Sequence, residues 1–275
     1  MIYVSLSRVQ RLEQLYILEE LPENKMKPWM DAKEEMKELE EQDQSKPQDN
    51  HFSFKLSSMN IYSLRGHFED LLEDMDFISS SVICLQESWT MPDDNEQDFA
   101  LPGKILSLNS IRRGAGLATY YPEDFQKTYT ATAWSFQITV VSSTDKAIVN
   151  LYRSSDANNA SLISHLETVV TQNLEKSIYI CGDWNLCHME EENHQIFAFL
   201  YARQFNPIRN PKATHKKGRC IDMIWSRDSE AKETFTEKSK FVYYSDHAQQ
   251  YFCLNADEKT ETENDILEES TLQGS

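Results

Sequence analysis

The 275-residue chain has little glycine and proline, with seven and eight residues respectively, which excludes collagen-like and low-complexity architectures. It lacks an apolar run near the roughly 18 residues that a membrane span needs, and polar residues recur from its first positions onward. We therefore expect neither membrane insertion nor secretion. Hydrophobic residues make up 40% and aromatic residues 11% of the chain, so most of it is expected to fold around a sizeable core.

Paired cysteines of the CxxC type are also absent. The cysteines number five, an odd count, and three of them fall in apolar runs that read as strands: Cys84, Cys181 and Cys253. We expect reduced thiols buried in the core. A zinc site built from Cys181, Cys187 and His188 is the alternative, but it lacks a second paired half.

Positive charge is scarce overall, with a formal net charge of −18, and this total argues against a nucleic-acid partner. Its distribution changes that reading. Residues 1–50 carry a net charge of −5 and residues 255–275 a net charge of −6, which leaves −7 for the middle of the chain. Within that middle part, residues 203–219 hold six cations and no acid: Arg203, Arg209, Lys212, Lys216, Lys217 and Arg219.

Composition and charge pattern divide the chain into three parts. We expect a charged helix and linker over residues 20–50, a folded domain over 51–254 and a disordered acidic tail over 255–275. Helical patterns occupy 67–79 and 161–175. Strand-like runs occupy 55–64, 81–86, 116–121, 136–143, 147–152, 177–182, 220–225, 241–244 and 250–254. This mixture predicts an α/β layered sandwich.

Side chains that can bind a metal ion, transfer a proton or donate hydrogen bonds recur where these strand-like runs end. They are Asn60, Gln86, Glu87, Tyr152, Arg153, Asp183, Asn185, Asp222, Asp246 and His247. Strand ends of a layered sheet can converge on one edge, and ligands favour such edges. Acids and amides without cysteine form an oxygen-rich site suited to Mg²⁺ or Mn²⁺. Such a site serves phosphate-ester chemistry, whereas scattered surface polar residues are the alternative reading.

The ordered motifs NIYSL, LQESW, RGAGLATYY, NLYRSS, GDWN, GRCIDMIW and YSDH span about residues 54–254. Taken in this order, the series resembles the endonuclease/exonuclease/phosphatase family, in the branch found in transposable elements. The resemblance implies an α/β sandwich of two mostly antiparallel sheets flanked by helices. It also implies Mg²⁺- or Mn²⁺-dependent hydrolysis of phosphate esters.

Roles carried over by this resemblance fall into two sets. The catalytic set is Asp183, which orients or activates water, Asn185, Tyr152, His247 at the scissile phosphate, and Asp222, which fixes that histidine. The metal set is Glu87, Asn60 and Asp246. A histidine beside a buried carboxylate keeps its proton near neutral pH and can donate it to phosphate.

Several positions depart from the family pattern. Tyr62 stands where some relatives carry a second acid, so one metal contact is in doubt. Ala115 replaces a common glycine, which matters only if that backbone position needs a positive φ. Trp184 replaces a more usual Phe and is expected to pack, and residues 91–110 look brief for a connection between two strands.

A second resemblance covers residues 1–19. The run MIYVSLSRVQRLEQLYIL is similar to the last motif of RecD-type superfamily 1 helicases, with Arg8 at the arginine that contacts ATP. No GxxxxGK[ST] phosphate loop occurs in the chain, so we expect no ATP binding or ATPase activity. Helicase motif, linker and endonuclease in this order resemble the C-terminal part of Helitron-type transposon proteins.

The expected substrate is DNA, which would be met in the nucleus. Its expected contacts are Arg153, Thr214, Lys216, Lys217 and Arg219, although a charge run is more often a solvated loop. Two alternatives stay open: phosphatase or phosphodiesterase action on a small phosphorylated molecule or lipid, and a catalytically inactive transposon remnant.

Overall fold

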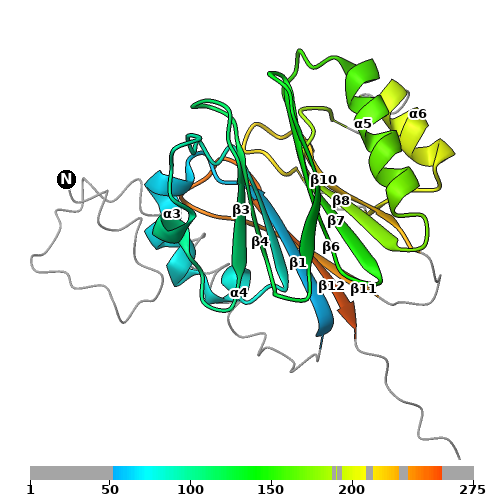
Figure 1. Ribbon diagram of the computed structural model, residues 1–275. Coiled ribbons are helices and arrows are strands. Elements are labelled where there is room, and N and C mark those ends of the chain that lie inside the picture. Colours follow the sequence, from blue (N-terminus) through cyan, green and yellow to red (C-terminus); the bar gives the residue numbers. More distant parts are fainter. Residues whose placement is uncertain (1–51, 188–189, 191–193, 209–212, 229–234, 256–275) are drawn as a thin grey trace, which may run out of the picture. The chain divides into compact units, whose positions relative to one another are not determined.

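The computed structural model describes residues 52–187, 190, 194–208, 213–228 and 235–255 (Figure 1). The helicase-like segment 1–19, the charged segment 20–50 and residues 256–275 of the expected tail lie outside the described residues. In the part of the chain that is described, no helix is long and apolar enough to cross a membrane.

Two six-stranded sheets form the domain. The first has the order β11-β12-β1-β2-β4-β3, with β1 Phe52–Asn60, β2 Val82–Gln86, β3 Ile105–Asn109, β4 Leu117–Tyr121, β11 Phe235–Phe241 and β12 Ala248–Asn255. The second has the order β5-β6-β7-β8-β10-β9, with β5 Gln126–Thr132, β6 Phe136–Ser142, β7 Lys146–Arg153, β8 Ser177–Asp183, β9 Asn206–Ile208 and β10 Asp222–Arg227. Neighbours are antiparallel except β1 with β2 and β7 with β8. The expected sandwich of two mostly antiparallel sheets is confirmed.

Helices cover the outer face of each sheet (Figure 1). They are α3 Leu64–Glu73, α4 Met75–Ile78, α5 Asn159–Gln172 and α6 Gln195–Ala202, with a 3₁₀ helix at Glu96–Phe99. The α5 helix begins where the Asn158 side chain accepts the Ser161 N–H and so satisfies a free amide of the first turn. Leu162, Leu166 and Val169 then recur at helical spacing and pack on the second sheet.

The central core lies between the sheets, where Leu56 and Cys84 of the first meet Ile148 and Cys181 of the second. All five cysteines are free, as expected for reduced thiols. The zinc alternative includes His188, which lies outside the described residues. Trp184 is fully buried and its Nε1 donates to the Met223 carbonyl at 3.1 Å, so the expected packing of this residue is confirmed.

The expected strand at 241–244 is wrong beyond its first residue, because β11 ends at Phe241 and the chain then turns toward His247. Strands β3, β5 and β9, and most of β11, were not expected. The β5 and β11 strands are edge strands rich in Thr and Lys, so they carry little apolar alternation. Residues 91–110, which looked brief, hold the 3₁₀ helix and β3.

Two backbone positions bear on the site. Gly182, directly before Asp183, has a φ of 148°, and a Cβ there would lie 1.8 Å from the Leu151 carbonyl oxygen. Only glycine lets β8 approach β7 this closely at the position directly before Asp183. Ala115, by contrast, is not among the residues with positive φ, although Gly114 and Gly116 on either side are. The alanine at that position therefore causes no backbone strain.

Candidate active site

One edge of the sandwich gathers the predicted site residues. Asn60 ends β1, Asp183 ends β8 and Asp222 begins β10, while His247 directly precedes β12. Because β10 and β12 run antiparallel to β8 and β1, their first residues meet the last residues of those strands. Asp222 is accordingly the register partner of Asp183, and the Asn60 amide reaches Asp183 from the other sheet.

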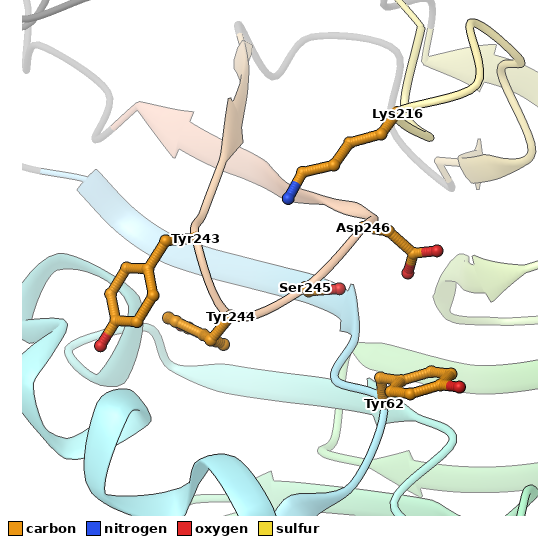
Figure 2. Close-up of a pocket in the computed structure, with 6 residues that line it drawn as sticks. All are labelled: Tyr62, Lys216, Tyr243, Tyr244, Ser245 and Asp246. Atoms are coloured by element: carbon orange, nitrogen blue, oxygen red, sulfur yellow. The ribbon is translucent and has the colours of Figure 1, made fainter. Parts of the chain in front are cut away.

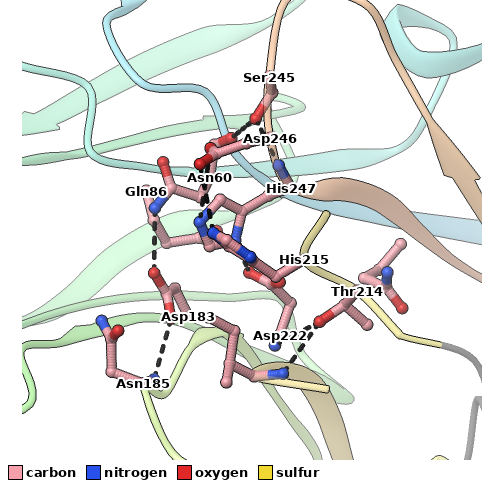
Figure 3. Close-up of polar contacts among 12 residues, drawn as sticks. Asn60, Gln86, Asp183, Asn185, Thr214, His215, Asp222, Ser245, Asp246 and His247 are labelled. Atoms are coloured by element: carbon pink, nitrogen blue, oxygen red, sulfur yellow. Dashed lines mark hydrogen bonds and ion pairs between the residues drawn. The ribbon is translucent and has the colours of Figure 1, made fainter. Parts of the chain in front are cut away.

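Asp222 and His247 form a buried pair at this edge (Figure 3). His247 Nδ1 lies 2.9 and 3.0 Å from the two carboxylate oxygens, so its N–H donates to Asp222. Burial, the largest single effect, lowers the pKa of His247, but the carboxylates of Asp222, Asp183 and Asp246 together outweigh it and raise that pKa to about 9. His247 is therefore an imidazolium at neutral pH. Its Nε2 lies 3.9 Å from the Asp246 carboxylate, too far for a hydrogen bond.

Both carboxylate oxygens of Asp183 accept hydrogen bonds. Oδ1 accepts the Asn185 backbone N–H at 2.9 Å, and Oδ2 accepts the Asn60 side-chain amide at 3.0 Å. Burial and the nearby Asp222 carboxylate raise the pKa of Asp183 to about 7. A carboxylate with this pKa and a fixed orientation is suited to accept a proton near neutral pH.

His215 was not assigned to the site from the sequence, yet it packs against His247 with ring centroids 4.8 Å apart. Its Nδ1 accepts the Lys217 backbone N–H at 3.0 Å, so Nε2 carries the proton and faces Asp246 Oδ2 at 3.2 Å. Burial and the charge of His247 lower the pKa of His215. In the sequence, His215 was distinguished only by its position within the cation-rich run, and that run shows no periodic pattern.

Two groups of His, Cys, Asp or Glu bring their ligand atoms within 4.8 Å of one another in the described part of the chain. Both contain His247: one adds His215 and Asp246, and the other adds Asp183 and Asp222. We call these five residues the His247 cluster. Of the predicted metal set, Asp246 belongs to the first group, Glu87 belongs to neither, and Asn60 is of a residue type that such groups do not include.

Glu87 follows β2 and is half-buried. Its Oε2 accepts the Trp89 indole N–H at 3.3 Å. Tyr152 lies close by: burial, the Glu87 carboxylate and Asp183 all raise the pKa of its hydroxyl. Tyr152 is consequently a neutral hydrogen-bonding group at this edge rather than a phenolate.

The oxygen donors at this edge fit a hard divalent cation. Glu87 and Asp246 offer carboxylates and Asn60 offers an amide oxygen, which accepts the Tyr62 backbone N–H at 3.1 Å and keeps a second lone pair. Neither of the two groups found in the described part of the chain contains a cysteine. The residues present therefore suit Mg²⁺ or Mn²⁺ better than a soft metal.

Two of the predicted substrate contacts have internal partners instead. The buried Arg153 guanidinium donates to the Asn159 side chain and the Trp184 carbonyl. Thr214 is fully buried, and its Oγ1 accepts the N–H groups of Ile221 and Asp222, both at 3.0 Å. Both side chains thus stabilise the backbone that carries Asn185 and Asp222.

The cation-rich run is not one continuous surface. Arg203 directly follows α6 and pairs with Glu167 of α5 at 2.5 Å, on the outer face of the second sheet. Arg209 and Lys212 lie outside the described residues. Arg219 faces Glu190 at 3.6 Å, whereas Lys216 and Lys217 are exposed in the turn that contains His215. Lys216 lines a pocket with Tyr62 and Asp246 (Figure 2).

Arg112 is a further cation that the sequence did not single out. Its charge acts on the Tyr152 hydroxyl, and its guanidinium lies 4.7 Å from the Trp134 ring centroid. Among the described residues, its buried Nε has no hydrogen-bond partner. The RRG string that contains it was visible in the sequence, but nothing there set it apart from an ordinary turn.

Comparison with known proteins gives a family match and a shared fold. Residues 147–251 match a family model described as endonuclease–reverse transcriptase. This stretch contains Tyr152, Asp183, Asp222 and His247. No curated protein is similar enough in sequence to count as a match.

Several solved structures share the fold. An AP endonuclease from Archaeoglobus fulgidus has 13% identity and a TM-score of 0.60, over 74% of this chain and 100% of that chain. The 3′ phosphatase NExo from Neisseria, bound to a product DNA hairpin, has 15% identity and a TM-score of 0.59 over the same shares. The endonuclease domain of TRAS1, a telomere-specific non-LTR retrotransposon, has 12% identity and a TM-score of 0.57, over 74% and 98%. The chain therefore matches a family model over part of its length and shares the fold of these three solved structures.

Proposed function

We propose that this protein hydrolyses phosphodiester bonds in DNA with the help of a divalent metal ion. The observation that carries the proposal is the buried arrangement of Asp183, Asp222 and His247, in which an imidazolium and a carboxylate with a pKa of about 7 lie side by side. Hydrolysis of a phosphate ester needs both groups: a base for the attacking water and a donor for the phosphate oxygens.

In this proposal Asp183 accepts a proton from the attacking water as the new P–O bond forms. The P–O bond to the leaving strand then breaks, and the leaving oxygen takes a proton from solvent and departs as a hydroxyl. The two hydrogen bonds from Asn60 and Asn185 hold the carboxylate in one orientation for that transfer. His247 donates its Nε2–H to a phosphate oxygen, and Asp222 fixes the imidazolium through Nδ1. Tyr152, which stays protonated, is a further donor to the phosphate.

Glu87, Asn60 and Asp246 would hold the metal ion. When bound, Mg²⁺ or Mn²⁺ supplies positive charge to the scissile phosphate and its leaving oxygen. Glu87 must be unprotonated to hold the ion.

DNA is favoured as substrate by the exposed Lys216 and Lys217 beside the His247 cluster, and by the DNA hairpin bound to NExo. A mobile-element origin is favoured by the ordered motifs and by the TRAS1 endonuclease fold. The nuclear location and the division into a helicase-like segment 1–19, a linker 20–50, a catalytic domain 51–254 and a tail 255–275 belong to the same proposal.

The test is nicking of supercoiled plasmid by the purified protein in Mg²⁺ or in EDTA, beside Asp183→Ala and His247→Ala. We expect nicking in Mg²⁺ that EDTA and either substitution abolish. Turnover of phosphomonoesters without nicking would favour a phosphatase acting on small molecules. Inactivity of the folded wild type on both substrates would favour a remnant and overturn the proposal.

A further inference from the structure

Two aromatic rings border the site: that of Tyr62, which stands where some relatives carry a second acid and is exposed, and that of Trp89, which is half-buried. Tyr62 is 50% exposed, and its ring centroid lies 4.4 Å from that of Trp89 with an interplanar angle of 53°. Both residues are in the left-handed region, with φ values of 53° and 52°. Bulky residues rarely adopt this conformation, and such strain concentrates at functional sites.

Both residues donate hydrogen bonds to proposed metal ligands. The Tyr62 backbone N–H donates to Asn60 Oδ1 at 3.1 Å, and the Trp89 indole N–H donates to Glu87 Oε2 at 3.3 Å. Asn60 in turn contacts Asp183. A planar group stacked on the exposed Tyr62 ring, which Trp89 supports from one side, would therefore lie beside the phosphate that the site is proposed to cut.

Positive charge accompanies the rings. The Arg113 guanidinium lies 5.7 Å from the Trp89 ring centroid. Lys216 and Tyr62 line the same pocket of about 350 Å³, together with Asp246 and Tyr243 (Figure 2). Exposed rings interleaved with cations are the pattern by which proteins bind single-stranded nucleic acid: rings stack on bases while cations follow the phosphates.

We infer that Tyr62 and Trp89 form a stacking platform for an unpaired base, so that the substrate is single-stranded DNA or an unpaired stretch within a duplex. This inference rests on the proposed function and names its substrate class. Bases inside a paired duplex are stacked on one another and offer no free face to a side chain. A fully paired duplex can therefore use the cations but not the rings.

The experiment measures binding of the full chain to fluorescent oligothymidylate and to a paired duplex in EDTA, where cleavage is not expected. Tyr62→Ala should weaken single-strand binding about 5- to 100-fold, the range for loss of one base–aromatic stack. Tyr62→Phe should keep it, because the ring remains. Duplex binding should be the same in all three proteins. Tyr201→Ala is the matched control, since Tyr201 is 38% exposed on α6 and packs against Trp225 instead.

A second measurement needs no variant. A 2-aminopurine base in the oligonucleotide loses fluorescence when it stacks on an aromatic ring, and wild type should quench it at one or two positions. Equal single-strand binding by wild type and Tyr62→Ala, or absence of quenching at every position, would overturn the inference. Stacking without any cleavage in Mg²⁺ would leave the inference intact and refute the proposed function. Cleavage with binding that ignores Tyr62 would do the reverse.

Discussion

The two halves of the site differ in how they are built. Asp183, Asp222 and His247 are buried at strand ends and have partners from both sheets. Tyr62, Trp89 and Lys216 lie on loops, face solvent at least in part and include two residues with left-handed backbone. The buried half is fixed by the fold and suits chemistry that a whole family can share. The exposed half can change without disturbing the sheets, and so suits the choice of substrate.

The largest effect is expected from breaking the buried pair. Asp222→Asn and His247→Ala should each lower the nicking rate by about 10²–10⁴-fold, the range for loss of a positioned acid or base. The double variant should be little worse than the more damaging single variant, because the two residues act as a unit. Asp145→Asn, an exposed acid paired with Lys146, is the control and should keep its rate. Independent, additive losses would contradict a coupled pair.

Stability should show the same contrast between buried and exposed positions. Gly182→Ala places a methyl group against the Leu151 carbonyl and should cost on the order of 3–5 kcal/mol of unfolding free energy. Gly218→Ala, in the exposed turn with a φ of 82° and open space around it, should cost only about 1–2 kcal/mol. Urea denaturation measures both. Equal costs would show that the close approach of β7 and β8 does not constrain the chain.

The buried half should also make stability depend on pH in the absence of metal. The pKa of Asp183 is raised to about 7 and that of His247 to about 9, so the folded state binds more protons than the unfolded chain between pH 4 and 9. Stability should accordingly fall as pH rises through this window.

Each of the two groups should contribute about 3 kcal/mol to the change, which is measured by urea denaturation in EDTA at pH 5, 7 and 9. In Asp183→Asn the part of the decline between pH 5 and 7 should shrink most. The part above pH 7, which comes from His247, should remain but be smaller, because the Asp183 charge contributes to the raised pKa of His247. A variant with the same profile as wild type would show that Asp183 titrates elsewhere.

The smallest effect is expected from the exposed cations. Lys216→Ala/Lys217→Ala should weaken DNA binding broadly and reduce the slope of log affinity against log salt by roughly 1–2. The double variant Lys127→Ala/Lys238→Ala, on the edge strands β5 and β11, is the matched control and should leave the slope unchanged. A slope that stays the same without Lys216 and Lys217 would remove this turn from the DNA path.

The same division explains what could be predicted from the sequence. Asp183, Asp222 and His247 adjoin apolar strands, and the pattern of those strands brings them to one edge. Tyr62, Arg112 and His215 depend on loop backbone conformation, which leaves no periodic signal. Tyr62 was noticed only as a missing acid. Strand β11 escaped notice because an edge strand can be built from Thr, Glu and Lys, which do not alternate with apolar residues.

Thr214 and Arg153 show a further limit of such prediction. Their residue types suggested contacts to phosphate, but both side chains bond the backbone beside Asp222 and Asn185. A side chain's type does not say whether its partner is a ligand or the chain itself, because the fold decides that.

The most direct test of the central claim is the single-turnover cleavage rate of one labelled oligonucleotide in Mg²⁺, measured for wild type and Asp183→Asn. The account predicts a rate lower by about 10²–10⁴-fold in the variant, with oligonucleotide binding in EDTA and the folded state both retained. Equal rates for the two proteins would place the chemistry outside the His247 cluster and contradict the account.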